Sequence, residues 1–123
     1  MTSKLSVLAV DDDDRNLRIL AEIFESDYDL YYARNGQEAL EMVAKVKPDI
    51  MLLDIMMPEI DGLEVCRRVK SKPELSNTKI ILVSARALPD ERAAGYAAGA
   101  DQYITKPFDH GELMDILSSM NME

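Results

Sequence analysis

Residues 50–54 read Ile50-Met51-Leu52-Leu53-Asp54, an apolar run of strand length that ends on a carboxylate. Two further stretches have the same apolar character, Leu5-Ser6-Val7-Leu8-Ala9-Val10 and Ile80-Ile81-Leu82-Val83. A strand that is apolar on both sides of the pleat is covered on both faces, which is typical of a parallel sheet between two layers of helices. Residues 30–33 and 102–105 are weaker strand candidates, and we expect them nearer the edges of the sheet.

Amphipathic segments separate the apolar runs. Apolar residues recur at the helical spacing i, i+3, i+4 and i+7 in three of these segments. The three sets are Leu17, Leu20, Ala21 and Phe24; Ala39, Met42, Val43 and Val46; and Leu113, Ile116, Leu117 and Met120. Three pairs have the spacing of capping boxes that begin helices: Asn35 with Glu38, Asp61 with Glu64, and Asp109 with Glu112. An alanine-rich helix from about residue 89 to 98 should be the least firmly held, since small side chains bury little area.

Five repeats of strand then helix predict an α/β fold with three layers and a parallel sheet. The chain has 123 residues without a Gly/Ser linker or a change in composition, so we expect residues 1–123 to form a single domain. The simplest strand order is 2-1-3-4-5, in which ligands bind at the carboxyl ends of strands 1 and 3. This predicts where the site lies before any motif is considered.

The net charge of −9 at pH 7 comes from 14 basic and 23 acidic residues. Such an excess of acidic groups argues against a surface for nucleic acid or for an anionic membrane, and it favours a cation site. The excess is uneven, because residues 1–62 hold six basic and fourteen acidic side chains, whereas residues 63–123 hold eight and nine.

The single cysteine, Cys66, excludes an internal disulfide and a multi-cysteine zinc site, and it fits a reducing compartment. The apolar stretch near the amino terminus is too short for the core of a signal peptide, and no run approaches the length of a membrane span. These observations predict a cytoplasmic protein.

Chemically useful groups follow the predicted strands. Four aspartates, Asp11 to Asp14, follow the first strand, Asp54 ends the third, Ser84 follows the fourth and Lys106 follows the fifth. Converging carboxylates repel one another unless a cation lies among them. Oxygen ligands with room for water suit Mg²⁺ better than a transition metal. The aspartate run is not an EF-hand loop, since the sixth position counted from Asp12 is Leu17 and not glycine.

Four fragments, in this order and each at the end of the expected strand, resemble the receiver domain of two-component response regulators. They are Val10-Asp11-Asp12-Asp13, Asp54-Ile55-Met56-Met57-Pro58 with Asp61-Gly62, Ser84-Ala85, and Lys106-Pro107-Phe108. The resemblance extends from Leu5 to about Ser119 and implies the flavodoxin-like (βα)5 fold. The sequence departs from the commonest pattern at Asp14, where many receivers have proline, and at Ser84, where threonine is also frequent.

The resemblance implies a role for each of these residues. Asp54 would be the phosphoacceptor, a carboxylate nucleophile that forms an aspartyl phosphate. Asp12 and Asp54 would bind Mg²⁺ directly, Asp11 through water, and Met56 through its backbone carbonyl; Mn²⁺ would substitute for Mg²⁺.

Two further implied roles concern the phosphoryl group. Lys106, before a cis peptide bond to Pro107, would pair with phosphoryl oxygens. Ser84 would move to hydrogen-bond a phosphoryl oxygen, and Tyr103 would then change rotamer. Met56 and Arg86 occupy positions that vary in the family and tune the lifetime of the phosphoryl group.

The function that the resemblance implies is a signalling switch. The chain would accept a phosphoryl group from a histidine kinase or a histidine phosphotransfer protein. It would catalyse only its own phosphorylation and dephosphorylation, so it would not be an enzyme in the usual sense. The helix at 89–98, the strand at 102–105 and the last helix would change their surface to control an effector domain or a target protein, and would form a homodimer on phosphorylation.

Two other functions stay open at this point. A pseudo-receiver would act only as a protein-binding module. A haloacid-dehalogenase-type phosphatase also has a nucleophilic aspartate after a strand, but it needs a second aspartate two positions later, where this chain has Met56. The sequence also leaves open whether the domain stands alone or is the N-terminal part of a longer regulator.

Overall fold

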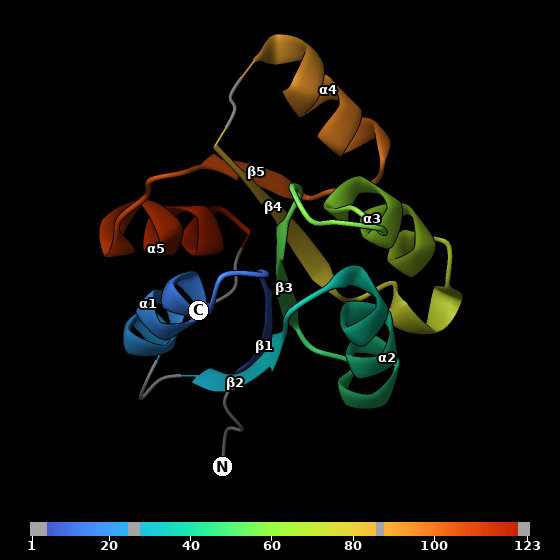
Figure 1. Ribbon diagram of the computed structural model, residues 1–123, viewed down its shortest axis with the longest axis horizontal. Helices are drawn as coiled ribbons and strands as arrows, with labels where there is room; N and C mark the ends of the chain where they lie inside the picture. Colours follow the sequence, from blue (N-terminus) through green and yellow to red (C-terminus); the bar gives the residue numbers. More distant parts are fainter. Residues whose placement is uncertain (1–4, 25–27, 86–87, 121–123) are drawn as a thin grey trace.

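The computed structural model describes residues 5–24, 28–85 and 88–120, in which strands and helices alternate along the chain (Figure 1). The strands are β1 (Leu5–Val10), β2 (Tyr28–Ala33), β3 (Ile50–Asp54), β4 (Lys79–Ser84) and β5 (Gln102–Thr105). The helices are α1 (Asp14–Phe24), α2 (Gly36–Val46), α3 (Gly62–Lys70), α4 (Pro89–Ala97) and α5 (His110–Ser119), with a short 3₁₀ helix, η1 (Pro73–Leu75). All strand pairs are parallel and the order is β2-β1-β3-β4-β5, so the predicted fold and topology are confirmed.

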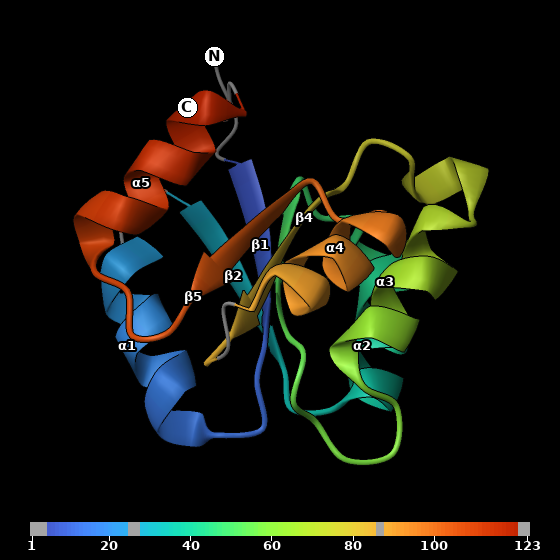
Figure 2. The same ribbon diagram turned by 90° about the horizontal axis from the view of Figure 1, so that it is seen from above.

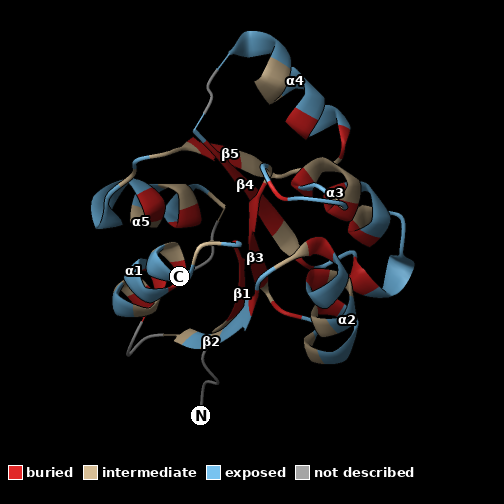
Figure 3. Cartoon of the chain, viewed as in Figure 1, coloured by how far each residue is buried: buried red, intermediate tan, exposed pale blue. Residues whose placement is uncertain are grey.

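The helices cover both faces of the sheet, α1 and α5 on one side and α2, α3 and α4 on the other (Figures 1 and 2). Each face has its own apolar core. Phe24 and Leu113 belong to the core under α1 and α5, and Val43 and Val65 to the core under α2 and α3. The three central strands β1, β3 and β4 are buried along most of their length, β3 completely, whereas the edge strand β2 is largely exposed or half-buried (Figure 3). This explains why the central strands lack the alternating pattern of a half-exposed sheet.

The three predicted helix starts are capped by the expected residues. The side chains of Asn35, Asp61 and Asp109 each accept a hydrogen bond from the backbone N–H three residues later. The reciprocal bond of a capping box is replaced at Glu64, whose carboxylate instead pairs with Arg67 and Arg68 in the same helix. The start of α3 is therefore capped by the side chain of Asp61 alone, which accepts the N–H of Glu64.

Two helices compare differently with the sequence prediction. The helix η1 was not predicted, because three residues carry no periodic pattern; it places Leu75 in the core at 2% exposure. The helix α4 buries a single residue, Gly95, fewer than any other α-helix, and appears largely pale blue in Figure 3. Its lack of buried area agrees with the expectation that α4 is held least firmly, which stays a prediction.

Cys66 is buried in α3 and its thiol donates to the carbonyl oxygen of Ala98. Burial raises the pKa of this thiol to about 11. Cys66 is therefore a small apolar residue of the core. Across residues 5–24, 28–85 and 88–120, no helix has both the length and the apolar character that a bilayer crossing requires.

Gly62 determines how closely α3 approaches the end of β3. A Cβ atom at this position would lie 2.3 Å from the carbonyl oxygen of Asp54, and backbone cannot give way as a side chain can. The Gly62 N–H donates to the carbonyl of Ile55, which closes the turn between strand and helix. The Asp61-Gly62 pair is thus needed to bring a helix start directly against the strand that carries Asp54.

Candidate functional site

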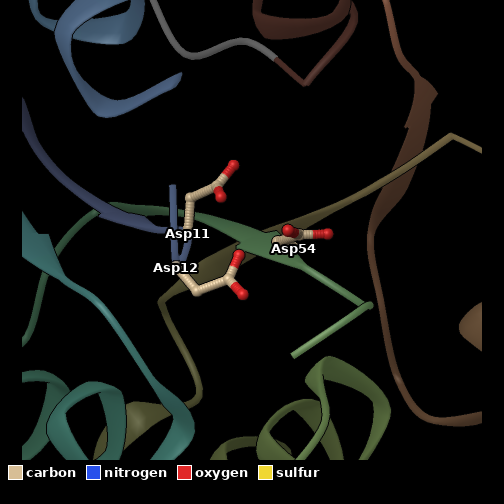
Figure 4. A group of neighbouring side chains, drawn as sticks. All are labelled: Asp11, Asp12 and Asp54. Carbon is tan, nitrogen blue, oxygen red and sulfur yellow. The ribbon is translucent and has the colours of Figure 1, made fainter. Parts of the chain in front are cut away.

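Three carboxylates meet at the carboxyl end of the sheet, where β1 and β3 lie side by side. Asp11 and Asp12 follow β1, and Asp54 ends β3 (Figure 4). One oxygen from each carboxylate can be chosen so that all three lie within 4.8 Å of one another. Asp11 and Asp54 are 3% and 5% exposed, whereas Asp12 is open to solvent. The predicted convergence of these three residues is confirmed.

The carboxylate of Asp11 is held by three donors. Its Oδ1 accepts the backbone N–H of Asp13 at 2.9 Å, and its Oδ2 accepts the amide of Asn16 and the ammonium of Lys106, each at 3.1 Å. Asp54 receives the backbone N–H of Met56 on Oδ1 at 3.2 Å. These bonds offset part of the cost of burying two carboxylates so close together.

Lys106 reaches the same cluster from the loop after β5. Its Nζ lies 3.1 Å from Asp11 Oδ2 and 3.4 Å from Asp54 Oδ2, so one ammonium is shared between two carboxylates. Burial by itself lowers the pKa of Lys106, but the Asp54 and Asp11 carboxylates outweigh it, and the pKa lies above its ordinary value. Lys106 is therefore charged at neutral pH.

The pKa of Asp54 lies above its ordinary value, chiefly because burial disfavours the charged form. Lys106 opposes this shift and the neighbouring Asp11 carboxylate adds to it. A buried carboxylate with a raised pKa binds its proton more tightly and is more basic than an exposed one.

The donor set fits a hard divalent cation. Three carboxylates and one ammonium leave an excess of two negative charges when all are ionised, and a divalent cation would neutralise that excess. The exposure of Asp12 leaves room for water ligands, which Mg²⁺ retains in most of its protein sites. The acidic cluster is thus suited to hold a metal ion.

The other predicted site residues lie around this cluster. Ser84 is buried at the end of β4, and its carbonyl accepts the N–H of Lys106 at 2.8 Å. Tyr103 of β5 is 4% exposed and belongs to the core under α2 and α3. The guanidinium carbon of Arg92 lies over its ring, 5.0 Å from the ring centroid. The Lys106–Pro107 peptide bond is cis. Arg86 lies outside the described residues.

A cavity of about 360 Å³ opens beside the cluster on the α1 side of the sheet. Its polar lining consists of Asp11, Asp54, Lys106 and Asn16, and its apolar walls include Ile19 of α1 and Phe108 after β5. Asn16 is a residue that the sequence reasoning missed. It lies five residues after Asp11, near the start of α1, and the sequence alone carries no signal of which side chain there faces that carboxylate.

The sequence is similar to those of a known family of domains. The family model of the response regulator receiver domain matches residues 7–118. The response regulator MprA of Mycobacterium leprae is 45% identical over 112 residues, which are 89% of this chain and 48% of that protein. The chain spans about half the length of the curated relatives it matches.

Two solved structures have closely similar folds. The chemotaxis protein CheY4 of Vibrio cholerae has a TM-score of 0.89 and 27% identity, with 95% of this chain and 98% of that chain covered. The receiver domain of the sensor histidine kinase PA1611 of Pseudomonas aeruginosa, solved with a magnesium ion in its active site cleft, has a TM-score of 0.86 and 26% identity, with 95% and 97% covered. With its fold, its acidic cluster and a family match over nearly its full length, the chain belongs to the response regulator receiver domains, the signalling domains of two-component systems.

Proposed function

We propose that the chain is a phosphorylation-driven switch in which Asp54 accepts a phosphoryl group. The observation that carries this proposal is the position of the Asp54 carboxylate, buried at the end of β3 within hydrogen-bond reach of Lys106 and beside two further carboxylates. Asp54 is thus a basic nucleophile placed between a fixed positive charge and a cluster suited to a cation. Phosphoryl transfer needs such positive charge around the transferring group.

The transfer itself is a simple exchange of bonds. One carboxylate oxygen of Asp54 forms a bond to phosphorus while the bond from phosphorus to the donor nitrogen of a phosphohistidine breaks, and the imidazole leaves with that electron pair. The Met56 N–H holds the other carboxylate oxygen, Oδ1, and so orients the group. Lys106 pairs with the phosphoryl oxygens as negative charge gathers on them.

Mg²⁺ would be held by Asp12 and Asp54 directly, by the carbonyl of Met56, and by Asp11 through water, and Mn²⁺ would substitute for it. When bound, the ion supplies positive charge next to the transferring group. The magnesium ion in the active site cleft of the PA1611 receiver supports this choice of metal.

The output is proposed to be a change in the surface formed by α4, β5 and α5. Ser84 and Lys106 are linked through the backbone, because the carbonyl oxygen of Ser84 accepts a hydrogen bond from the N–H of Lys106. Tyr103 packs against Gly95 of α4, where an added Cβ would come within 3.1 Å of the ring. A movement of Ser84 toward the phosphoryl group would therefore change the space that Tyr103 and α4 share.

The partners are proposed from the same features. The donor is a histidine kinase or a histidine phosphotransfer protein, and the exposed apolar side chains of Ile19 and Met56 beside the site support a protein donor. The target is an effector domain or a separate protein in the cytoplasm. Phosphorylation would also favour a homodimer through the α4–β5–α5 surface.

The test is incubation of the purified chain with acetyl phosphate and MgCl₂, followed by intact mass spectrometry. We expect a mass increase of one HPO₃ group in the native chain and none in Asp54→Asn. Asp49→Asn is the matched control, because Asp49 lies at the opposite end of β3 from Asp54 and its carboxylate accepts hydrogen bonds from Ser6, away from the cluster. Equal addition to Asp54→Asn would overturn the assignment of Asp54, and no addition to the native chain would favour a pseudo-receiver.

Asp12→Asn separates metal binding from nucleophilic attack. Asp12 is exposed, so its substitution leaves the core unchanged. We expect Asp12→Asn to require a much higher Mg²⁺ concentration for phosphorylation while Asp54 stays competent. Phosphorylation of the native chain in EDTA at the full rate would contradict the proposed need for a divalent ion.

A further inference from the structure

Asn16 contacts the carboxylate cluster but belongs to none of the roles described so far. It lies in the first turns of α1, half-buried, and lines the cavity beside Asp54. Its side-chain amide donates to Asp11 Oδ2 at 3.1 Å. A neutral amide at this place holds the Asp11 carboxylate by a hydrogen bond and adds no charge to the site.

The lone pairs of Asp11 define what this residue can offer to a cation. Each carboxylate oxygen has two acceptor positions. Both positions on Oδ2 are occupied, one by Asn16 and one by Lys106, while Oδ1 accepts one bond from the Asp13 N–H. One position on Oδ1 therefore remains for a metal ion or for a water bound to it.

Three different parts of the chain hold the Asp11 carboxylate: its own loop through Asp13, helix α1 through Asn16, and the loop after β5 through Lys106. In Figure 4 the side chain of Asp11 is turned to the opposite side from that of Asp12. In the proposed reaction Lys106 pairs with the phosphoryl oxygens and shares less of its charge with Asp11. Asn16 is then the side-chain donor that still holds Oδ2 in place.

We infer that Asn16 is a positioning residue of the metal site, which keeps the Asp11 carboxylate in the orientation that leaves Oδ1 available to the cation. This inference rests on the proposed function, because it requires the cluster to bind Mg²⁺. Partners in the second shell of a metal site typically affect metal affinity by about 10- to 100-fold when they are removed. A half-exposed site with two other donors on Asp11 should lie near the lower end of that range.

The experiment measures the affinity for the metal alone, without a phosphoryl donor. Mn²⁺ binding is followed by the loss of the free-ion signal in electron paramagnetic resonance, and Mg²⁺ affinity by competition with Mn²⁺. We expect a dissociation constant about 10-fold higher in Asn16→Ala than in the native chain. Asn77→Ala is the matched control, since it makes the same change at an exposed asparagine just before β4, at the opposite end of the sheet from the cluster; its affinity should be unchanged.

A second measurement distinguishes positioning from general damage to the fold. In phosphorylation by acetyl phosphate, Asn16→Ala should raise the half-saturating Mg²⁺ concentration about 10-fold and leave the rate at saturating Mg²⁺ within about twofold. Asn16→Gln, which retains an amide, should recover part of the affinity, and Asn16→Ser, too short to reach Asp11, should behave like Asn16→Ala. Circular dichroism of each variant without metal checks that the fold is intact.

The outcomes separate this inference from the proposed function. If the native chain binds neither Mn²⁺ nor Mg²⁺, the proposed function fails at its metal site. If the native chain binds them and both Asn16→Ala and Asn16→Ser bind them equally well or more tightly, the positioning role of Asn16 is wrong and the proposed function stands.

Discussion

Both ends of the sheet carry a lysine next to an aspartate, and the two places differ in charge balance. At the amino end of the strands, Lys70 lies 2.9 Å from Asp101. At the carboxyl end, Lys106 lies 3.1 Å from Asp11 and 3.4 Å from Asp54. The side chains of Lys70 and Lys106 are 20% and 26% exposed, so burial does not distinguish them.

The amino-end pair is satisfied within the protein. Asp101 also accepts the N–H of Ile80, and Lys70 also donates to the carbonyl of Thr78, so one cation meets one anion and the spare groups bond to backbone. Its location follows from helix direction, because α3 runs antiparallel to the strands and ends at their amino edge. This pair ties α3 to the starts of β4 and β5.

Among the residues that the structure describes, the charges of the carboxyl-end cluster do not balance. Lys106 faces Asp11 and Asp54, and Asp12 lies within reach of both carboxylates. The comparison teaches that the amino-end pair neutralises itself within the protein, whereas the carboxyl-end cluster carries an excess of negative charge that a divalent cation would neutralise. Three changes test this difference, in order of decreasing expected effect.

The largest effect should come from exchanging each lysine for methionine and measuring phosphorylation by acetyl phosphate. We expect Lys106→Met to lower the rate about 100-fold, since it removes the positive charge that we propose pairs with the phosphoryl oxygens. Lys70→Met should leave the rate within about twofold at a temperature where both variants are folded. Equal losses in the two variants would mean that the clusters do not differ in function.

The second effect concerns stability at the amino end. Lys70→Met should lower the free energy of unfolding by about 2 kcal/mol, because Asp101 loses its cation and the Thr78 carbonyl loses a donor. Lys72→Met, at an exposed lysine two residues later, should change it by less than about 0.5 kcal/mol. Urea denaturation followed by circular dichroism measures both, and similar values for the two variants would contradict a structural role for the Lys70–Asp101 pair.

The smallest effect has opposite signs at the two ends. In EDTA at pH 7, Asp54→Asn should raise the free energy of unfolding by about 1 kcal/mol, because it removes a buried charge beside another carboxylate. Asp101→Asn should lower it by a similar amount, since it breaks a balanced pair.

The pH dependence of this effect follows from the raised pKa of Asp54. The folded chain holds the Asp54 proton more tightly than the unfolded chain, whose carboxyl has the ordinary pKa of 3.8. The stabilisation that comes from the tightly held Asp54 proton is fully present below the unfolded pKa of 3.8. It is lost as the pH rises through the pKa that Asp54 has in the folded state. The advantage of Asp54→Asn should therefore shrink as the pH falls from 7 toward 3.8, and an advantage that grows on acidification would contradict the raised pKa.

Much of the fold could be predicted because it depends on local pattern. Apolar runs such as residues 50–54 indicate strands buried on both faces, and Asn35, Asp61 and Asp109 mark helix starts where the structure has them. The helix η1 could not be predicted, since its three residues are set by the packing of Leu75 and not by a repeat. Nor could the pairing of Glu64 with two arginines, which competes with the reciprocal capping bond.

The candidate site, like the fold, contains residues that could be placed from the sequence and one that could not. Residues that follow strands, such as Asp11, Asp54 and Lys106, could be placed together from the chain alone, because parallel strands bring their carboxyl ends to one edge. Asn16 could not, since whether it or its neighbour on α1 faces Asp11 depends on how the helix is rotated against the sheet.

The charge of the chain shows most clearly where local pattern ends and packing begins. The surplus of acidic residues and its position in the first half are properties of the composition, and they already pointed to a cation. Which aspartates each lysine pairs with depends on the packing of segments that are far apart in the sequence. Lys70 and Asp101 are 31 residues apart in the chain, and Lys106 and Asp11 are 95 residues apart. Coulomb energy depends on separation in space and on the burial of each charge, and both quantities arise only when the layers of the fold are packed together.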